Sequence, residues 1–352
     1  MTLSTENTFR AVYRNFKNRN PSCDNIDILI TVLNAELGIG GYSVTPSVIT
    51  GIRDLNGFCV CYNNHKAFMP QRSVFNHPKT VFEYIGNILN EAEIITPNYI
   101  GYGVLGTLAD GIKNASNKED KLMLGERALT AMFPPEILSL LVTEHYPKFS
   151  ALEQCIVQIR ETTEAYCLGL YRSAITTLLP CIENAIRALG VQLNINQPEN
   201  VGTQFFLSIY DAWLKYYIYD YMYRDYDWMP QSIRERKFFG GFDERFQIGL
   251  NGRNYFEKHL YQSSKKDIGL SKLNRHSILH GFMDEYHTKG NYLRLINLLN
   301  NICFMMTIAG ESVSLFLPEK TEKYQAFYAN LTVQERVGLN RAMFLDANSI
   351  AR

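Results

Sequence analysis

The stretch Ala165–Gly190, AYCLGLYRSAITTLLPCIENAIRALG, decides the fold class of this chain. Its apolar side chains recur at three- and four-residue spacings from Leu168 to Leu189, as in a helix that buries one face, and Gly190 is a natural C-terminal stop. Pro180 removes one backbone hydrogen bond, so we expect a kink there or two shorter helices. The stretch therefore predicts the core helix of a helical bundle.

Helical patterns continue on the C-terminal side of this stretch. We expect a second helix from about Thr203 to Tyr223 and a last strong helix from about Asn291 to Leu317. Between them, Met229–Leu273 has the pattern of a long irregular segment. Residues 150–320 are therefore predicted to form one all-α bundle.

Residues 321–352 are predicted to form a C-terminal helical tail. The pattern favours one or two amphipathic helices, and Thr332 with Glu335 offers a capping box for a helix start. The tail is treated as a region of its own, after the bundle.

The first part of the chain, residues 1–149, mixes helical and strand patterns. Asn56-Gly57 stands between two runs of apolar, β-branched and aromatic residues, which predicts a hairpin turn. Helices are expected at Thr8–Lys17, Thr80–Ala92, Lys118–Ala131 and Pro134–His145. The predicted fold is thus mainly α, with a C-terminal helical bundle and a smaller mixed α+β N-terminal region.

Composition and charge narrow the class of protein. The 352 residues are 46% hydrophobic and 20% charged, which is typical of a globular chain. The 35 Lys and Arg residues balance 35 Asp and Glu residues, so any site for a polyanion must be local. The seven scattered cysteines form no disulfide framework, and neither a signal peptide nor a bilayer-spanning apolar run is recognised. We expect a cytoplasmic protein with no membrane partner.

The densest polar cluster is Leu273–Gly281, LNRHSILHG, just before the last bundle helix. Asn274 is a good N-cap, which would make Arg275 the first helical residue, where unpaired backbone amides favour an anion such as phosphate. His276 and His280 are four positions apart and share a helix face. Arg275 and His280 are five positions apart, so they converge only if the arginine reaches around from the first turn.

Arg275 and His280, placed inside an α-bundle, resemble the RX4-6H motif of the HEPN superfamily (higher eukaryote and prokaryote nucleotide-binding). The segment Tyr171–Glu183 is similar to the early core helix of these domains, which ends in a glutamate. The resemblance covers roughly half the chain, about 150–320. The long segment before the motif departs from a minimal HEPN bundle, and residues 1–149 lie outside the resemblance.

The resemblance implies a metal-independent endoribonuclease that acts at a composite site of a homodimer and uses no cofactor. Such enzymes occur in toxin and anti-phage defence systems. In this chain proton transfer to or from RNA would fall to His280, and Arg275 would stabilise the charged phosphorane. His276 would orient the phosphate or His280. The N-terminal region would act as a sensor or bind a regulatory protein or antitoxin.

RNA binding is expected beside the motif. Positive residues outnumber negative ones by ten to five between positions 231 and 280 of this neutral chain. Asn274, Lys272 and Lys266 are the candidate substrate-binding residues, although a solvated loop would show the same charges. The aromatic run at 209–229 could stack on bases, but helix packing or a subunit interface is the more usual role of such a run.

Metal binding is an alternative use of the polar residues near the motif. A cluster could be drawn from His276, His280, Asp284, Glu285 and His287. Arg275 would repel a cation there, so we expect no metal. A zinc site could be drawn from Cys59, Cys61, His65 and His77. Two thiols on one strand face lack a second ligand pair, so buried strand cysteines fit that pattern better.

A second functional hypothesis keeps the fold without the chemistry. A HEPN-like bundle can dimerise and scaffold another component while cleaving nothing, and the motif at 275–280 does not exclude this role. A metal-dependent hydrolase is a third possible class. EDTA distinguishes it, because the chelator stops a metal-dependent hydrolase but leaves a metal-independent ribonuclease active.

Overall fold

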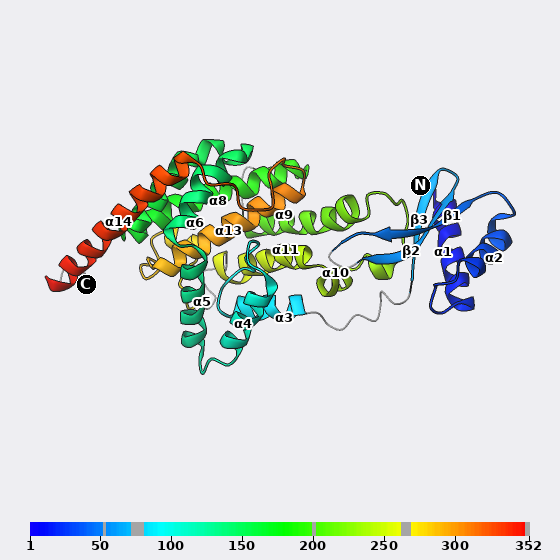
Figure 1. The fold of residues 1–352 in the computed structure, drawn as a ribbon, viewed down its shortest axis with the longest axis horizontal. Helices are drawn as coiled ribbons and strands as arrows, with labels where there is room; N and C mark the ends of the chain where they lie inside the picture. The colour runs from blue at the N-terminus through cyan, green and yellow to red at the C-terminus, as the bar shows by residue number, and fades with distance from the viewer. Residues whose placement is uncertain (52–53, 72–80, 199–201, 262–268, 349–352) are drawn as a thin grey trace. The chain divides into compact units, whose positions relative to one another are not determined.

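The computed structural model describes residues 1–51, 54–71, 81–198, 202–261 and 269–348. Helices dominate, and the sheet is confined to the N-terminal part of the chain (Figure 1). The prediction of a mainly α fold with a smaller mixed α+β N-terminal region is confirmed.

The chain divides into two compact units. One unit combines Met1–Glu83 with Leu214–Gln247, and the other combines Tyr84–Trp213 with Ile248–Arg352. This division differs from the boundary expected near residue 150, because the helices between 84 and 149 pack with the later bundle helices.

The N-terminal unit consists of a three-stranded antiparallel sheet, in the order β1-β2-β3, with helices packed against it (Figure 1). Phe9 and Phe16 pack with Phe58 and Val60 in its core. The elements of this unit are α1 (Leu3–Arg19), α2 (Ile26–Leu37), β1 (Ser43–Ile49), β2 (Leu55–Tyr62), β3 (His65–Pro70), η5 (Tyr217–Met222), η6 (Gln231–Ile233) and α10 (Arg236–Phe242).

The predicted hairpin turn at Asn56-Gly57 is wrong, because both residues lie inside β2 and pair with β1. The turn between β2 and β3 is Asn63-Asn64, whose φ angles of 50° and 60° suit a tight hairpin turn. Gly57 is needed for a different reason. A Cβ atom there would lie 2.6 Å from both the Met69 carbonyl oxygen and the Phe68 ring.

Residues far along the chain complete the N-terminal sheet. The Phe68 amide donates to the Trp228 carbonyl at 2.8 Å, and the Asp227 and Trp228 amides donate to the Lys66 carbonyl at 2.8 and 3.1 Å. These bonds continue the ladder at the free edge of β3. They explain why residues 214–247 belong to the N-terminal unit.

The second unit is a helical bundle built around α13, in which only Lys289 and Thr307 escape burial. Helix α8 packs against both α7 and α13. The elements of the bundle are α3 (Val81–Glu91), α4 (Tyr102–Lys113), α5 (Lys118–Met132), α6 (Pro135–Leu140), η2 (Leu141–His145), η3 (Tyr146–Lys148), η4 (Ser150–Cys155), α7 (Ile156–Cys167), α8 (Tyr171–Gln192), α9 (Thr203–Tyr216), α11 (Glu244–Tyr255), η7 (Phe256–Leu260), α12 (Arg275–Leu279), α13 (Lys289–Ile308) and α14 (Glu322–Ala347).

The stretch that predicted the core helix is divided at Gly169. This glycine lies between the end of α7 and the start of α8 and has a φ of +73°. Pro180 lies inside α8, which runs unbroken from Tyr171 to Gln192. Within the described residues α8 is the one helix long and apolar enough to cross a bilayer, and 56% of its apolar window is buried inside the protein.

The prediction that Met229–Leu273 is a long irregular segment is wrong. It contains α10, α11 and η7, and Asp243 caps α11 by accepting hydrogen bonds from the Arg245 and Phe246 amides at 2.8 and 3.1 Å. Glycines within α10 and α11 weakened the helical signal in the sequence, because glycine disfavours a helix. A Cβ atom at Gly249 would lie 2.2 Å from the Trp213 ring, so close packing requires glycine there.

The last helices also differ from their predicted bounds. Helix α13 ends at Ile308, before the expected end at Leu317. Helix α14 begins after Thr321, whose side chain accepts a hydrogen bond from the Tyr324 amide. Thr332, the predicted capping residue, lies inside α14 and donates to the Tyr328 carbonyl at 2.9 Å.

Candidate functional site

The motif forms the short helix α12. Asn274 is its N-cap, with its Oδ1 accepting from the Ser277 amide at 3.0 Å, and Arg275 is the first helical residue. Both predictions are confirmed. His280 is the C-cap, and Gly281, with a φ of +73°, ends the turn.

Arg275 reaches back to the core helix α8. Its Nε donates to Glu183 Oε1, and its Nη2 donates to Glu183 Oε2 at 3.2 Å. The Tyr261 hydroxyl donates to the same carboxylate at 2.5 Å, and the Arg275 guanidinium lies over the Tyr261 ring at 5.9 Å from its centroid. We call Glu183, Tyr261 and Arg275 the arginine clamp.

The contacts of the arginine clamp raise the pKa of Arg275 and of Tyr261. Burial disfavours the charge on Arg275, but the hydrogen bond and charge of Glu183 outweigh this effect and raise the pKa of the guanidinium. Burial, followed by the Glu183 charge, raises the pKa of the Tyr261 hydroxyl far above its ordinary value. Arg275 is therefore a cation and Tyr261 a proton donor at neutral pH.

The two motif histidines lie side by side on the surface. The ring centroids of His276 and His280 are 4.4 Å apart, and both side chains are exposed. Phe282, which is 71% exposed, stacks on His280 with centroids 6.1 Å apart. Among the described residues the Arg275 guanidinium makes no hydrogen bond to either imidazole, so the convergence of Arg275 and His280 on one phosphate stays a prediction.

A second arginine, Arg172 of α8, contacts the residues that follow the motif. Arg172 forms an ion pair with Asp284, its Nη2 lies 3.4 Å from His287 Nδ1, and its guanidinium lies 6.0 Å from the Tyr286 ring centroid. Arg172 and Glu183 are eleven residues apart, or about three helical turns, and so share one face of α8. The segment from Arg275 onward therefore follows that face.

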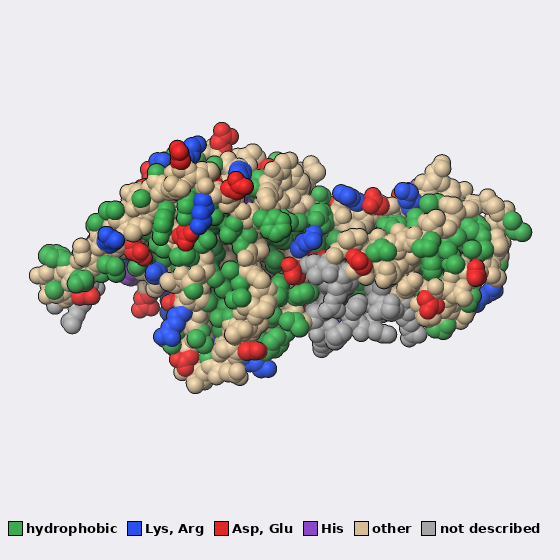
Figure 2. Space-filling view, in the orientation of Figure 1, with side chains coloured by type: hydrophobic (Ala, Val, Ile, Leu, Met, Phe, Trp, Pro, Cys, Tyr) green, Lys and Arg blue, Asp and Glu red, His purple; other side chains and the backbone are tan. Residues whose placement is uncertain are grey.

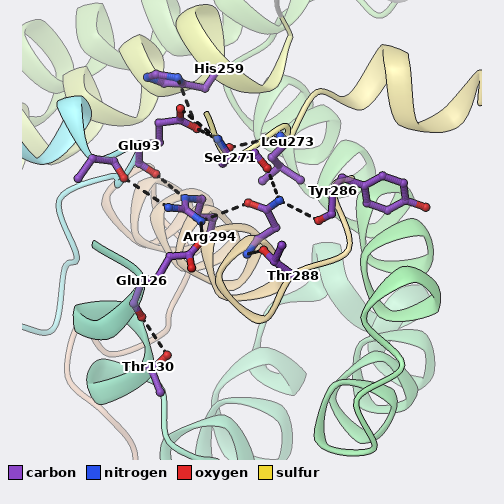
Figure 3. Close-up of polar contacts among 11 residues, drawn as sticks. Glu93, Glu126, Thr130, His259, Ser271, Leu273, Tyr286, Thr288 and Arg294 are labelled. Carbon is purple, nitrogen blue, oxygen red and sulfur yellow. Dashed lines mark hydrogen bonds and ion pairs between the residues drawn. The ribbon is translucent and has the colours of Figure 1, made fainter. Parts of the chain in front are cut away.

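Buried polar contacts around Arg294 anchor the backbone near the motif to the bundle (Figure 3). Arg294 of α13 is 1% exposed, and its Nε donates to the Glu93 carbonyl at 3.1 Å. Its Nη1 donates to Glu126 at 2.9 Å and to Asn291 Oδ1 at 3.2 Å. A buried guanidinium requires such partners, because leaving it unpaired costs several kcal/mol.

Asn291 of α13 binds the backbone on both sides of the motif. Its Nδ2 donates to the Ser271 carbonyl at 2.6 Å and to the Tyr286 carbonyl at 2.8 Å. The Glu93 carboxylate accepts from the Ser271 amide at 3.4 Å and lies 3.9 Å from His259 Nδ1. The backbone before and after α12 is thus anchored to the bundle core.

The three candidate substrate-binding residues differ in burial, and one of them lies outside the described residues. Asn274 is 0% exposed and serves as a cap, so its side chain does not reach the surface as a substrate contact would require. Lys272 is half-buried in a left-handed backbone conformation with φ +59°, and Lys266 lies outside the described residues. Direct contact of Lys272 or Lys266 with RNA stays a prediction.

The local excess of positive charge is smaller on the surface than in the sequence. Arg253 donates to Asp211 at 2.9 Å and to Glu257 at 2.9 Å, so its charge is neutralised within the bundle. Residues 231–247 belong to the N-terminal unit and the rest of the basic segment to the bundle. The described cations of this segment are therefore divided between the two units.

Neither metal alternative weighed from the sequence has a ligand set in the part of the chain that the structure describes, where no group of three or more His, Cys, Asp or Glu side chains could hold a metal ion. The Sγ atoms of Cys59 and Cys61 lie 3.9 Å apart on one strand face, and burial raises the pKa of the Cys59 thiol to about 11. His77 lies outside the described residues.

The sequence signalled part of this site. Arg275, His276, His280 and Asn274 follow from local spacing, and Glu183 was indicated by the resemblance. Tyr261 and Arg172 were not singled out, because their contacts depend on how distant segments meet in the fold. Compared with known proteins, the chain matches no family model, no curated protein and no solved structure.

Proposed function

We propose that the protein is a metal-independent endoribonuclease of HEPN type, with His276, His280 and Arg275 as its catalytic residues. The observation that carries the proposal is the exposed pair of imidazoles at the end of a turn that begins with the clamped Arg275. Histidine exchanges protons near neutral pH, and a guanidinium can stabilise the charge that develops on a phosphorane.

In the proposed reaction His280 takes the proton of an RNA 2′-hydroxyl, and the resulting oxygen attacks the adjacent phosphorus. The bond from phosphorus to the 5′-oxygen breaks, and a second imidazole donates a proton to that oxygen. The products are a 2′,3′-cyclic phosphate and a free 5′-hydroxyl. Arg275 would bind the phosphorane after loosening one of its two bonds to Glu183.

The geometry of this reaction favours a homodimer. An attacking and a leaving oxygen lie on opposite sides of phosphorus, so the base and the acid must also approach from opposite sides. His276 and His280 of one chain are adjacent rings on a single turn and serve one side. A second copy of the motif would supply the other, at a composite two-fold site.

Phe282 and Arg172 extend the proposed substrate surface. Phe282 is exposed beside His280 and offers a ring on which an unpaired base can stack. Arg172 lies farther along the same segment, where a phosphate could compete with Asp284 for its guanidinium. A cytoplasmic toxin or anti-phage effector, regulated through the N-terminal unit, is the biological setting that we propose with this activity.

Cleavage of RNA in the presence of EDTA tests the proposal. Wild-type protein should cut, and His280→Ala and Arg275→Ala should each lower the rate by at least about 100-fold, the usual contribution of one acid–base or charge-stabilising group. His65→Ala, a histidine of the N-terminal unit, is the control and should retain activity. Equal rates for wild type and both motif variants would refute the assignment.

A second candidate is a non-catalytic module that dimerises and binds a partner. The arginine clamp favours it, because the Arg275 guanidinium is already engaged by Glu183 and Tyr261 and so has a structural role. On this account Arg275→Ala would destabilise the bundle, and purified wild type would leave every RNA intact. Thermal unfolding of the same variants separates the two candidates.

A further inference from the structure

A cavity within the N-terminal unit is lined by the end of β1, by residues between 221 and 226 and by Arg245. Its volume is about 320 Å³, and its lining is more polar than apolar. Every lining residue belongs to the N-terminal unit, so the cavity is separate from the α12 motif. Small-molecule sites span about 300–1,000 Å³, so the cavity has the size of a site for a small ligand. We call it the N-terminal cavity.

Two arginines line the N-terminal cavity. Arg224 is exposed on the segment after η5, and Arg245 is half-buried as the second residue of α11. Arg245 Nη1 donates to the Tyr221 hydroxyl at 3.0 Å. In the part of the chain that the structure describes, neither guanidinium forms an ion pair with a carboxylate. A guanidinium has five N–H donors, so both arginines have donors available for an anionic ligand.

Other half-buried arginines differ from Arg245 in this respect. Arg253 and Arg275 are also half-buried, and each donates to a carboxylate. The acid nearest to Arg245 in sequence on the other side of Glu244 is Asp243, which is 0% exposed and does not line the cavity. Its Oδ1 accepts from the Tyr217 hydroxyl at 2.9 Å and from two amides at the start of α11. The hydrogen bonds of Asp243 therefore stabilise the start of α11 and do not neutralise the guanidinium.

Two tyrosines of the cavity are held in place by other aromatic rings. Tyr221 stacks on Tyr217 with ring centroids 5.3 Å apart, and Tyr226 packs against Phe68 at 5.1 Å. The Tyr226 hydroxyl lies 2.6 Å from the Ser47 hydroxyl, and burial raises the pKa of Tyr226. Rings that are already ordered reduce the entropy that binding costs. The cavity therefore offers preformed aromatic surface next to its arginines.

Asp225 also lines the cavity and carries the opposite charge. Two arginines and one aspartate leave the lining with one net positive charge. A carboxylate accepts hydrogen bonds but cannot donate them, so Asp225 repels a bare anion and binds hydroxyl or amino groups. The lining thus suits a ligand with a negative group at one end and hydrogen-bond donors at the other.

The charges of the N-terminal unit favour a small anion over a polyanion. On the face of this unit shown at the right of Figure 2, Lys and Arg side chains are scattered among Asp and Glu side chains. RNA is bound by rows of positive charge that follow its backbone. The two arginines of the cavity instead provide positive charge at one place.

We propose that the N-terminal cavity binds a nucleoside monophosphate. In the proposed complex Arg224 and Arg245 donate charge-assisted hydrogen bonds to the phosphate. Asp225 accepts from the hydroxyl groups of the ribose, and the base packs on the ring of Tyr221 or Tyr226. One phosphate group carries about 1.5–2 negative charges at neutral pH, which two guanidiniums can balance. This ligand site goes beyond the proposed ribonuclease activity and does not depend on it.

Isothermal titration calorimetry of the full-length chain tests the class of ligand. AMP and UMP should each bind at one site per chain. Adenosine lacks the phosphate, ribose 5-phosphate lacks the base, and inorganic phosphate lacks both sugar and base. Each of these three probes should bind at least about tenfold more weakly than AMP, because each loses one set of contacts. Equal affinity for inorganic phosphate and AMP would overturn the inference.

Substitutions in the cavity test its place. Arg224→Ala and Arg245→Lys should each weaken AMP binding at least about tenfold, because alanine removes a charge and lysine cannot bind phosphate through two parallel bonds. Arg10→Ala is the matched control, because Arg10 is an exposed arginine of α1 outside the cavity, and it should keep the wild-type affinity. Arg224 is exposed, so its variant should also keep the wild-type thermal transition. Unchanged affinity in both cavity variants would overturn the inference.

Asp225→Ala tests how the ligand is oriented. The variant removes an acceptor for the sugar and a charge that repels phosphate. The preference for AMP over inorganic phosphate should therefore fall, and an unchanged preference would contradict the proposed contact with the ribose.

Two further measurements separate this site from the α12 motif and from RNA binding. His280→Ala should leave AMP binding unchanged, and a short 2′-O-methylated RNA should not displace AMP from the wild type. Loss of AMP binding in His280→Ala would place the ligand at the motif, and displacement by RNA would identify a different ligand. Either result, or no binding of AMP and UMP at millimolar concentration, would contradict the proposal while leaving the ribonuclease assignment to its own test.

Discussion

The buried imidazole of His145 links the stability of the bundle to pH. Its side chain is 2% exposed and its Nε2 lies 2.6 Å from the Tyr99 hydroxyl. Burial, with a smaller effect of the Lys148 charge, lowers the pKa of His145 from 6.5 to about 4. The unfolded chain therefore binds this proton more tightly than the folded chain between those values.

The sign of the effect follows from that difference. The lowered pKa of His145 contributes about 3 kcal/mol to the unfolding free energy. This contribution is fully present above about pH 6.5 and is lost as the pH falls to about 4. His145→Gln keeps a hydrogen-bonding group for Tyr99 but does not titrate. Urea unfolding at several pH values should therefore show a steeper acid loss for wild type; parallel curves would contradict this assignment.

Side chains near the motif show what local spacing can predict. The cap by Asn274 and the helical start at Arg275 depend on neighbours within a turn, and both were predicted from the sequence. The Arg275–Glu183 pair joins residues 92 positions apart, so spacing alone contained no sign of it. The burial of Asn274 depends on the surrounding bundle, which is why it was mistaken for a substrate contact.

At the scale of elements, the β2–β3 hairpin shows that a glycine beside an asparagine can be required for close packing and not for a turn. Glycine at position 57 makes room for the Met69 carbonyl and the Phe68 ring rather than for a turn. The turn itself uses Asn63 and Asn64, both with positive φ. Asn-Gly is a strong turn signal in general, so the prediction placed the turn at Asn56-Gly57 and did not consider Asn63-Asn64.

Two substitutions separate these roles. Gly57→Ala should lower the unfolding free energy by about 1–3 kcal/mol, because the added methyl group overpacks the strand. Asn64→Gly should stabilise the hairpin or leave it unchanged, because glycine adopts the turn conformation without strain. Chemical denaturation measures both. A larger loss for Asn64→Gly than for Gly57→Ala would show that the turn had been misplaced.

Glycine also explains why α11 and the start of α8 were missed. Gly249 lies in α11 against Trp213, so a residue that weakens a helix in isolation is required by packing. Gly169 ends α7 with a positive φ, inside a run whose apolar spacing continues without interruption. Periodicity detects the apolar face of a helix, but it does not detect a break that preserves that face.

At the scale of the whole molecule, helical content was predictable but the grouping of helices was not. Composition and periodicity identify a mainly α chain. The assignment of residues 214–247 to the N-terminal unit depends on backbone bonds between Lys66, Phe68 and residues 227–228, which no local pattern encodes. Helices α5 and α6 likewise join the bundle through contacts with α13 and α14.

The central claim for the whole molecule is that it cleaves RNA by attack of the 2′-hydroxyl without a metal ion. The most direct test compares one single-stranded RNA with its fully 2′-O-methylated copy, both incubated with purified protein in EDTA. The account predicts cleavage of the unmodified RNA only, with 2′,3′-cyclic phosphate ends that are absent from reactions with His280→Ala. Cleavage of the methylated strand, or products that carry 5′-phosphates, would contradict it.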